Sequence, residues 1–433
     1  MTKSRRAFAR LPGFRDFPPE EYALRSHLFE AWRRVSRRYG FLEYDAPPLE
    51  GLELYTEKSG EEIVGQLYNF VDKGDREVAL RPEMTPSLAR MLGERSRALP
   101  KPIRWFSIPQ LFRYERPQRG RLREHFQWNV DLVGEAGEGG DVEVLAVAID
   151  GLRELGLGVD DFRARVSDRR LLSAVLGAAG VAPEGHPAAF AIIDKVEREA
   201  GDRSAARLQA EAGMDEAGAR RLLELLATPG LEGMRSSFGG DAAVEEALGR
   251  LDRYSADLHA LGLGEFLEFD LRIVRGLAYY TGIVFELFDR QGELRAICGG
   301  GRYDRLLELV GGDPLPAVGF GMGDVVLTEL LKDRGRLPGY VREVDYFLVA
   351  LGDDARTLSL GLARDLRARG ASVLYPLRDQ GMKKQFASAS TEGAREVVVM
   401  GPDEVARGVA RVRVMATGEE RVLELDALRS GEG

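Results

Sequence analysis

Cysteine and histidine, two residue types that commonly bind zinc, are scarce in this chain of 433 residues. Cys298 is the only cysteine, so no disulfide can form within the chain, and a reducing, cytoplasmic location is expected. The four histidines lie far apart, and one cysteine cannot complete a Cys/His cluster of the usual spacing. The sequence therefore predicts no metal held by Cys or His. Any metal is expected to be a hard cation that arrives with a phosphate substrate.

Long hydrophobic runs are also absent. No stretch approaches the roughly 18 apolar residues of a membrane span, and the basic start MTKSRRAFARLPGF is not followed by the apolar segment of a secretory signal. The net charge of -9 and the pI of about 5.4 argue against non-specific nucleic-acid binding, although a local basic patch could dock one particular RNA. With 44% hydrophobic residues, the chain is expected to be globular, with about two to four domains.

The N-terminal part of the chain mixes helical and strand patterns. Helical periodicity covers 20–39 and, as an amphipathic helix, 139–156. Thr85 and Pro86 have the residue types of an N-cap and a first helical residue, so a helix is predicted to begin there. Residues 101–133 are typical of a strand, a basic loop and a second strand.

The C-terminal part begins with a long helical region. The Ala/Leu/Glu/Arg-rich stretch 168–262 has helical periodicity and almost no strand signal. Strands are predicted at 266–289 and 293–298, and then a glycine turn into a helix over 299–310. Gly, Pro and charged residues make 331–343 the best candidate for a linker between domains. Beyond it, strands alternate with helices, which predicts a small α/β domain with a mainly parallel sheet.

FRYERPQRGRLREHFQWNVD, residues 112–131, carries five arginines and is either a solvated basic hairpin or part of an anion site. Arg113 suits a phosphate, and Glu115 can accept a hydrogen bond from an amino group such as that of adenine. In a strand over 124–132, alternate side chains face opposite sides. The polar side consists of His125, Gln127, Asn129 and Asp131. These residue types favour the floor of a polar pocket over a solvated face.

Three glycine-containing stretches follow. VRGLAYYTGIVFELF, 274–288, places an arginine and two tyrosines in an otherwise apolar strand; the alternative is a core strand with a bulge. GGGRYD, 299–304, lacks the ending of a P-loop, so its glycines are predicted either to let the backbone come close to a ligand or to turn sharply into the next helix. AVGFGMGDVVLTELL, 317–331, alternates glycine with apolar residues, which favours a strand beside a ligand or a partner strand.

Together these stretches carry a family resemblance. Arg113-Tyr114-Glu115, the basic loop and Gln127 resemble motif 2 of the class II aminoacyl-tRNA synthetases. The Pro47-Pro48 segment resembles motif 1, and AVGFGMG resembles the glycine strand of motif 3. LRPEMT, RGLAYYTG and GGGRYD resemble the histidyl-tRNA synthetases specifically. Six motifs in that family's order, within residues 8–425, are a specific signal.

The resemblance implies an α+β fold: a class II antiparallel sheet of about six or seven strands flanked by helices, with a helical insertion, plus a C-terminal α/β anticodon-binding-like domain. It also implies a homodimer joined through motif 1, with L-histidine, ATP and tRNA(His) as partners and no membrane. The expected domains are the first part of the catalytic domain at 1–167, the helical insertion at 168–262, the second catalytic part at 263–333, a linker at 334–343 and the anticodon-binding domain at 344–433.

The chemistry that the resemblance implies is attack of a histidine carboxylate on the α-phosphate of ATP. Two anions must meet, so the site needs fixed positive charge. ATP comes as a substrate with Mg²⁺, and no zinc or organic cofactor is expected. The resemblance gives the catalytic role to Arg113 and Arg275. The residues expected to bind histidine are Glu83, Met84, Thr85, Arg113, Gln127, Asp131, Arg275, Tyr279 and Tyr280. Those expected to bind ATP are Arg113, Glu115, Arg121, His125 and Gly321. Those expected at the tRNA acceptor end are Arg116, Gln118 and Arg119.

The sequence departs from the family pattern at two places. His125 stands where an aromatic residue, usually Phe, stacks on adenine, and an imidazole can still stack. Val325 and Val326 stand where motif 3 normally carries a Glu-Arg pair, whose arginine lies against adenine and the γ-phosphate. Another cation is therefore expected to hold the triphosphate tail. The candidates for this cation are Arg121, Arg123 and Arg302.

Two other functions compete with that of a histidine–tRNA ligase. A non-catalytic paralogue that senses histidine as a regulatory subunit of ATP phosphoribosyltransferase would usually lack the C-terminal domain and the Arg-Gly-Leu-x-Tyr-Tyr stretch, and this chain keeps both. Another class II ligase, for threonine or proline, would have a different amino-acid pocket and often zinc ligands. ATP–pyrophosphate exchange driven by histidine alone would separate the three.

Overall fold

The computed structural model describes residues 8–59, 61–197, 199–274, 280–292, 294–305, 307–308, 311–312, 314–340 and 342–430. The chain forms two compact units, Met1–Pro338 and Gly339–Gly433. None of the helices within the described ranges is long and apolar enough to cross a membrane.

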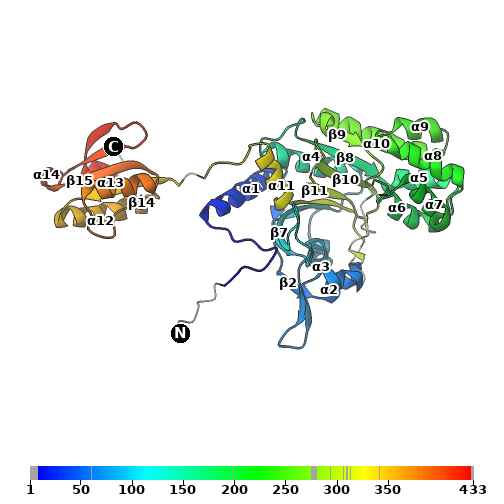
Figure 1. Ribbon diagram of the computed structural model, residues 1–433, viewed down its shortest axis with the longest axis horizontal. Coiled ribbons are helices and arrows are strands. Elements are labelled where there is room, and N and C mark those ends of the chain that lie inside the picture. Colours follow the sequence, from blue (N-terminus) through cyan, green and yellow to red (C-terminus); the bar gives the residue numbers. More distant parts are fainter. Residues whose placement is uncertain are drawn as a thin grey trace, which may run out of the picture. The chain divides into compact units, whose positions relative to one another are not determined.

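A sheet of nine strands, counted over the described residues, forms the centre of the first unit (Figure 1). The strand order is β1-β5-β7-β12-β11-β10-β8-β9, and β6 pairs with β7 beside this path. The edge pairs β1–β5 and β8–β9 are parallel, and the six strands from β5 to β8 pair antiparallel. The expected class II antiparallel fold is thus confirmed. The strands are β1 (Leu42–Glu43), β5 (Ile103–Ser107), β6 (Gln110–Phe112), β7 (Glu124–Val133), β8 (Phe162–Asp168), β9 (Leu267–Phe269), β10 (Ile283–Asp289), β11 (Cys298–Arg302) and β12 (Ala317–Gly323).

An aromatic core covers one face of this sheet. Trp128 on β7 stacks on Trp32 of α1 (Pro19–Arg38) at 5.9 Å between ring centroids, and it meets Phe320 of β12 edge-on at 5.0 Å. The indole N–H of Trp128 donates to the hydroxyl of Ser36 at 3.0 Å, so its polar atom is satisfied in the core. The apolar side of β7 therefore faces the helices, as its alternating pattern predicted.

Helix α4 (Glu138–Arg153) lies in this core and is buried almost all round. It contacts the sheet, α1 and α10 (Ala242–Ala260). The expectation of an amphipathic helix over 139–156 is corrected. The side of α4 that faces away from the sheet is covered by helices distant in sequence, and local periodicity does not reveal such contacts.

Helices fill most of the stretch between β8 and β9, at the green edge of the first unit in Figure 1. Asp168 caps α5 by accepting from the backbone N–H of Arg170, and Asp241 caps α10 in the same way. The helices are α5 (Arg169–Ala178), α6 (His186–Ile193), α7 (Gly201–Ala212), α8 (Glu216–Ala227), α9 (Glu232–Phe238) and α10.

A small sheet and two helices lie near the second face of the main sheet. The strands are β2 (Leu49–Gly51), β3 (Asn69–Val71) and β4 (Glu77–Leu80), and the helices are α2 (Glu53–Ser59) and α3 (Thr85–Arg95). Thr85 is the first residue of α3, and Met84 occupies the N-cap without a side-chain hydrogen bond. The predicted cap at Thr85 is thus misplaced by one residue.

The glycines of GGGRYD lie inside β11 rather than in a turn, and β11 is displaced from the strand predicted at 293–298. A Cβ on Gly300 would stand 2.4 Å from the carbonyl oxygen of Gly319 and 2.6 Å from Cβ of Phe320. The glycines are required because β12 packs closely against β11. The backbone does come close to a neighbour, but at Gly300 that neighbour is a strand rather than the predicted ligand, and no sharp turn is formed there. The chain continues through β12 into α11 (Asp324–Asp333).

The second unit is built on a five-stranded sheet, counted over its described residues, in the order β14-β13-β15-β16-β17. The first three strands are parallel and the last two antiparallel. Along β13, Leu348 packs with α12 and α15, whereas Phe347 and Val349 pack with α13 on the opposite face. The elements are β13 (Val344–Ala350), α12 (Asp353–Ala368), β14 (Val373–Leu374), α13 (Met382–Thr391), β15 (Ala394–Met400), α14 (Pro402–Arg407), β16 (Val409–Val414), β17 (Glu420–Glu424) and α15 (Leu425–Ser430).

The close contact between α4 and Trp128 predicts that a glycine inside this helix cannot be replaced by alanine without loss of stability. A Cβ on Gly151 would stand 2.3 Å from Cζ3 of Trp128, a ring that is 0% exposed. Gly151→Ala should therefore destabilise the first unit by about 1–3 kcal/mol despite the helix propensity of alanine. Gly249→Ala, in the middle of α10 with only the tip of Arg253 at 3.8 Å, should stabilise by up to about 1 kcal/mol. Thermal unfolding measures both, and equal effects of the two changes would contradict this packing.

Candidate active site

Two adjoining hollows lie over the polar face of β7 in the first unit. The larger has a volume of about 840 Å³ and the smaller of about 80 Å³. Arg113, Gln127, Gly299 and Gly321 line both hollows, so the two meet at this group. The site can thus hold two small molecules whose reactive ends come together beside Arg113.

The smaller hollow is lined mainly by neutral polar and acidic groups. Asp131 is 6% exposed and accepts a hydrogen bond from the hydroxyl of Tyr303 on the chain after β11. Tyr280 meets the ring of Tyr303 edge-on at 6.4 Å. Two carboxylates beside hydroxyl and amide groups suit an ammonium ion with polar atoms on its side chain. The structure brings together six of the residues predicted to bind histidine: Glu83, Thr85, Arg113, Gln127, Asp131 and Tyr280.

Three other residues expected here are placed differently or lie outside the described ranges. The side chain of Met84 is 0% exposed, and its Sδ lies 3.9 Å from Nη1 of Arg81 beneath the start of α3. Met84 therefore lines neither hollow. Arg275 and Tyr279 lie outside the described residues. Arg169, the first residue of α5, donates to the carbonyl oxygens of Val274 and Tyr280 on either side of them.

The larger hollow is cationic on balance. Among the described residues, three guanidinium groups line it, from Arg113, Arg121 and Arg295. Nε of Arg113 donates to the carbonyl oxygen of Pro82 at 3.0 Å, which fixes this side chain where the two hollows meet. Such a group of guanidinium ions is suited to a polyphosphate. The remaining polar lining includes Glu115, His125 and Glu286.

Glycines on β12 make room for the polar side chains of β7. A Cβ on Gly321 would stand 2.6 Å from Cδ of Gln127, and one on Gly319 would stand 2.4 Å from Oδ1 of Asp131 and 2.5 Å from the hydroxyl of Tyr303. Gln127 and Asp131 therefore lie across the neighbouring strand, over positions where no side chain fits. The close approach predicted for this glycine strand is what the structure shows.

His125 lines the larger hollow from the beginning of β7. Burial lowers the pKa of His125 to about 3, and the nearby positive charges of Arg113 and Arg15 act in the same direction. The imidazole is therefore neutral at physiological pH. A neutral flat ring in this position can stack on a nucleobase without adding charge to the hollow.

Two arginines of the basic loop between β6 and β7 form ion pairs with nearby carboxylates of this chain. Arg121 is paired with Glu115, with Nη2 to Oε1 at 2.7 Å, so the carboxylate expected to accept from adenine is occupied by a loop arginine. Arg119 pairs with Glu329 at 3.3 Å and Asp333 at 3.0 Å on α11. The other two residues expected at the tRNA end, Arg116 and Gln118, are exposed.

Two of the three arginines predicted to replace the missing motif 3 cation do not line the larger hollow. Arg302 is 2% exposed and forms a buried pair with Asp141 on α4, with Nη2 to Oδ2 at 2.6 Å. Arg123 lies over the ring of Tyr114 at 4.3 Å. For Arg302 the expectation is corrected, because its whole guanidinium is used to join β11 to α4.

The chain matches two family models. One is described as Histidyl-tRNA synthetase and covers residues 13–324, and the other is described as Anticodon binding domain and covers residues 345–430. The chain belongs to the histidyl-tRNA synthetase family. The resemblance carried by the six motifs is thereby confirmed.

Relatives of this family member include curated proteins and solved structures. It is 45% identical to the Histidine–tRNA ligase of Opitutus terrae, over 95% of each chain. It is 41% identical to the chloroplastic/mitochondrial Histidine–tRNA ligase of Arabidopsis thaliana, over 96% of this chain and 85% of that one. The crystal structure of histidyl-tRNA synthetase from Nostoc sp. PCC 7120 has a TM-score of 0.81 at 24% identity, covering 98% of this chain and 99% of that one.

A second solved structure shows why the fold alone does not decide the activity. It is titled an ATP phosphoribosyltransferase regulatory subunit/histidyl-tRNA synthetase, from Bacillus halodurans C, and has a TM-score of 0.74 at 23% identity, covering 91% of this chain and 98% of that one. At that identity the likeness concerns the fold. The curated relatives, at 45% and 41% identity, favour the ligases.

Sequence reasoning missed two residues of this family member's site. Tyr303 lies within GGGRYD, and its role as the partner of Asp131 depends on the pairing of β11 with β12. Arg295 lies in a segment with no motif, between β10 and β11, so no sequence signal pointed to it. Only the tertiary arrangement shows that Tyr303 and Arg295 line the site.

The depressed pKa of His125 predicts a pH effect on stability. Between its unfolded pKa of about 6.5 and its folded pKa of about 3, the unfolded chain binds a proton that the folded chain does not, so acid favours unfolding. His125→Phe should therefore gain roughly 2–3 kcal/mol relative to the wild type when the pH falls from about 7.5 to about 4.5. Denaturant titrations at both pH values measure this gain. A stability difference that does not change with pH would contradict the neutral state of the ring.

Proposed function

We propose that this chain is a cytoplasmic histidine–tRNA ligase. It activates L-histidine with ATP to histidyl-adenylate and diphosphate, and then transfers the histidyl group to the 3′ end of tRNA(His) with release of AMP. The observation that carries the proposal is the opposite character of the two joined hollows. One is acidic and suits an amino acid, the other is cationic and suits ATP, and Arg113 lies where they meet.

The smaller hollow is the proposed histidine site. Glu83 and Asp131 take the ammonium group, and Tyr303 holds the carboxylate of Asp131 in place. Gln127 and Thr85 offer further hydrogen bonds. Tyr280, with Tyr279 outside the described residues, supplies the imidazole end of the pocket. A site that hydrogen-bonds the ring rejects apolar amino acids strongly, because its own polar groups would be left unpaired.

The larger hollow is the proposed ATP site. His125 stacks on adenine, and the backbone at Gly321 allows a close approach. Arg113 holds the α-phosphate beside the histidine carboxylate and, together with Arg275, stabilises the charge that develops during in-line attack. Glu115 accepts from the adenine amino group once Arg121 turns to the phosphates.

Mg²⁺ comes to this site with the triphosphate. The carboxylate of Glu286 lines the hollow, and hard oxygen donors of this kind fit Mg²⁺. When bound, the ion neutralises charge on the leaving diphosphate.

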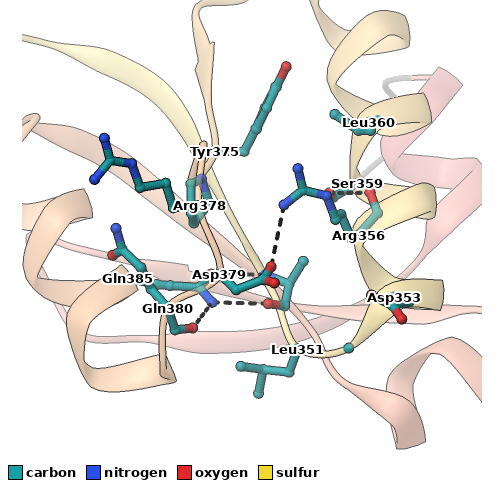
Figure 2. Close-up of a pocket in the computed structure, with 13 residues that line it drawn as sticks. Leu351, Asp353, Arg356, Ser359, Leu360, Tyr375, Arg378, Asp379, Gln380 and Gln385 are labelled. Carbon is teal, nitrogen blue, oxygen red and sulfur yellow. Dashed lines mark hydrogen bonds and ion pairs between the residues drawn. The ribbon is translucent and has the colours of Figure 1, made fainter.

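Two surfaces of the chain are proposed to bind tRNA(His). The basic loop meets the acceptor end through Arg116, Gln118 and Arg119, after Arg119 leaves its carboxylate partners on α11. In the second unit, a pocket of about 260 Å³ lies where β13 and β14 end (Figure 2). Arg356 there pairs with Asp379 at 3.5 Å, while the exposed Arg378 makes no ion pair among the described residues. We propose that this polar pocket takes a base of the anticodon loop.

A homodimer joined through the motif 1 region is part of the proposal. Apolar side chains are exposed in this part of the first unit: Leu42 on β1 is 67% exposed, and Phe70 and Val71 on β3 are 51% and 60% exposed. Large apolar side chains exposed in this way occur at protein–protein interfaces.

Amino-acid-dependent ATP–pyrophosphate exchange tests the proposed activity. Histidine should drive exchange, and threonine and proline should not, because only histidine satisfies the polar groups of the smaller hollow. Arg275→Ala should lower the exchange rate by about 10²–10³-fold, as expected for loss of a donor to the transition state. A histidine-sensing regulatory subunit would bind histidine without exchange, and this result would refute the ligase.

Removal of the second unit should separate the two steps. Deletion of residues 341–433 leaves a first unit with its own core, so histidine-dependent exchange should persist while charging of tRNA(His) falls severely. In the full chain, Arg378→Ala should raise KM for tRNA severalfold and leave exchange unchanged. Normal charging by the truncated protein would show that the second unit does not bind tRNA.

A further inference from the structure

The cationic wall of the larger hollow is interrupted at the start of α11. Val325 and Val326, the second and third residues of this helix, line the hollow there and present apolar side chains to it. Gly120 of the basic loop lies against Val326, since a Cβ on Gly120 would stand 3.3 Å from Cγ2 of Val326. This part of the wall therefore offers no charge of its own to a polyphosphate.

Arg295 lies beside these valines. The antiparallel pairing of β11 with β12 ends at Cys298 and Met322, and the next contact is from the backbone N–H of Gly323 to the carbonyl oxygen of Ile297 at 3.3 Å. The chain before Ile297 therefore runs alongside the first turn of α11. Arg295 is two residues before Ile297, and it lines the same hollow as Val325 and Val326.

The guanidinium of Arg295 is available for a ligand. Arg295 is exposed and makes no hydrogen bond or ion pair with any of the described residues. Arg121, by contrast, is paired with Glu115. Arg295 also lies near the other cations of the hollow. Their positive charges act on one another: burial and then the charges of Arg295 and Arg113 lower the pKa of Arg121. Three guanidinium groups held this close repel one another until an anion joins them.

We propose that Arg295 binds the leaving diphosphate portion of ATP and supplies, from the segment before β11, the positive charge that the first turn of α11 lacks. The proposal rests on the proposed ligase activity and adds a phosphate-binding residue to it. Its chemistry is that of a planar guanidinium donating two hydrogen bonds to phosphate oxygens, which a lysine reproduces only as a point charge.

Histidine-dependent exchange measures this role, because both ATP and pyrophosphate are substrates of the assay. Arg295→Ala should raise KM for ATP and for pyrophosphate by about tenfold or more, the loss expected for a charge-assisted hydrogen bond. KM for histidine should change by less than about twofold, since Arg295 does not line the smaller hollow. Arg295→Lys should lie between the alanine variant and the wild type.

Two further variants separate a phosphate contact from a structural effect. Arg290→Ala removes the same charge from the same connection, but Arg290 does not line the hollow and donates to the carbonyl oxygen of Val159. It should leave all three KM values unchanged. Val326→Arg in the Arg295→Ala background should lower KM for ATP again, because it returns a guanidinium to the same wall from the helix side.

The failures of the two proposals are distinguishable. A wild-type chain without histidine-dependent exchange refutes the ligase activity itself. If the wild type exchanges normally and Arg295→Ala keeps its KM for ATP and pyrophosphate within about threefold, the role of Arg295 is refuted and the ligase stands. A rise in KM for histidine equal to that for ATP would also overturn it, because it would mean that the whole site is disturbed.

Discussion

The close packing of β7 against β12 is the constraint on which the site depends. Gln127 and Asp131 can lie across β12 only because Gly319 and Gly321 have no side chains. A Cβ on Gly321 would stand 2.6 Å from Cδ of Gln127, and one on Gly319 would stand 2.4 Å from Oδ1 of Asp131. The same arrangement brings Tyr303 to Asp131, since β11 packs just as closely on the other side of β12. The polar face of β7, the smaller hollow and the part of the larger hollow that adjoins it therefore depend on the packing of β7 against β12.

Strand alternation and motif spacing were enough to predict much of this arrangement. The polar and apolar faces of β7 were predicted correctly, because a period of two residues is a local property. The glycine strand was recognised for the same reason. Burial of α4 was not predicted, since helix α10, about a hundred residues later, covers its outer side. The turn predicted at 299–310 was wrong because glycine indicates a turn locally, whereas here it permits close packing of strands.

Whether the position of an arginine was predicted correctly depended on the path of the chain segment that carries it. Arg113 lines both hollows as predicted, because it lies directly on the strand connection beside β7. Arg302 was expected near the phosphates, but its guanidinium is buried against Asp141 instead. Arg295 belongs to no motif, and only the pairing of β11 with β12 brings it to the hollow. Long side chains in connecting segments are the part of a site that sequence patterns locate least well, because their position depends on contacts between distant strands.

The burial of α4 has a consequence for the motions of the first unit. This helix contacts the central sheet on one side and α1 and α10 on others, so it joins the N-terminal helix, the sheet and the helices between β8 and β9 in one packed body. Local fluctuations cannot expose its backbone without separating these layers. Its amide hydrogens should therefore exchange with solvent only when the unit unfolds as a whole, and their exchange rates would give its global free energy of unfolding.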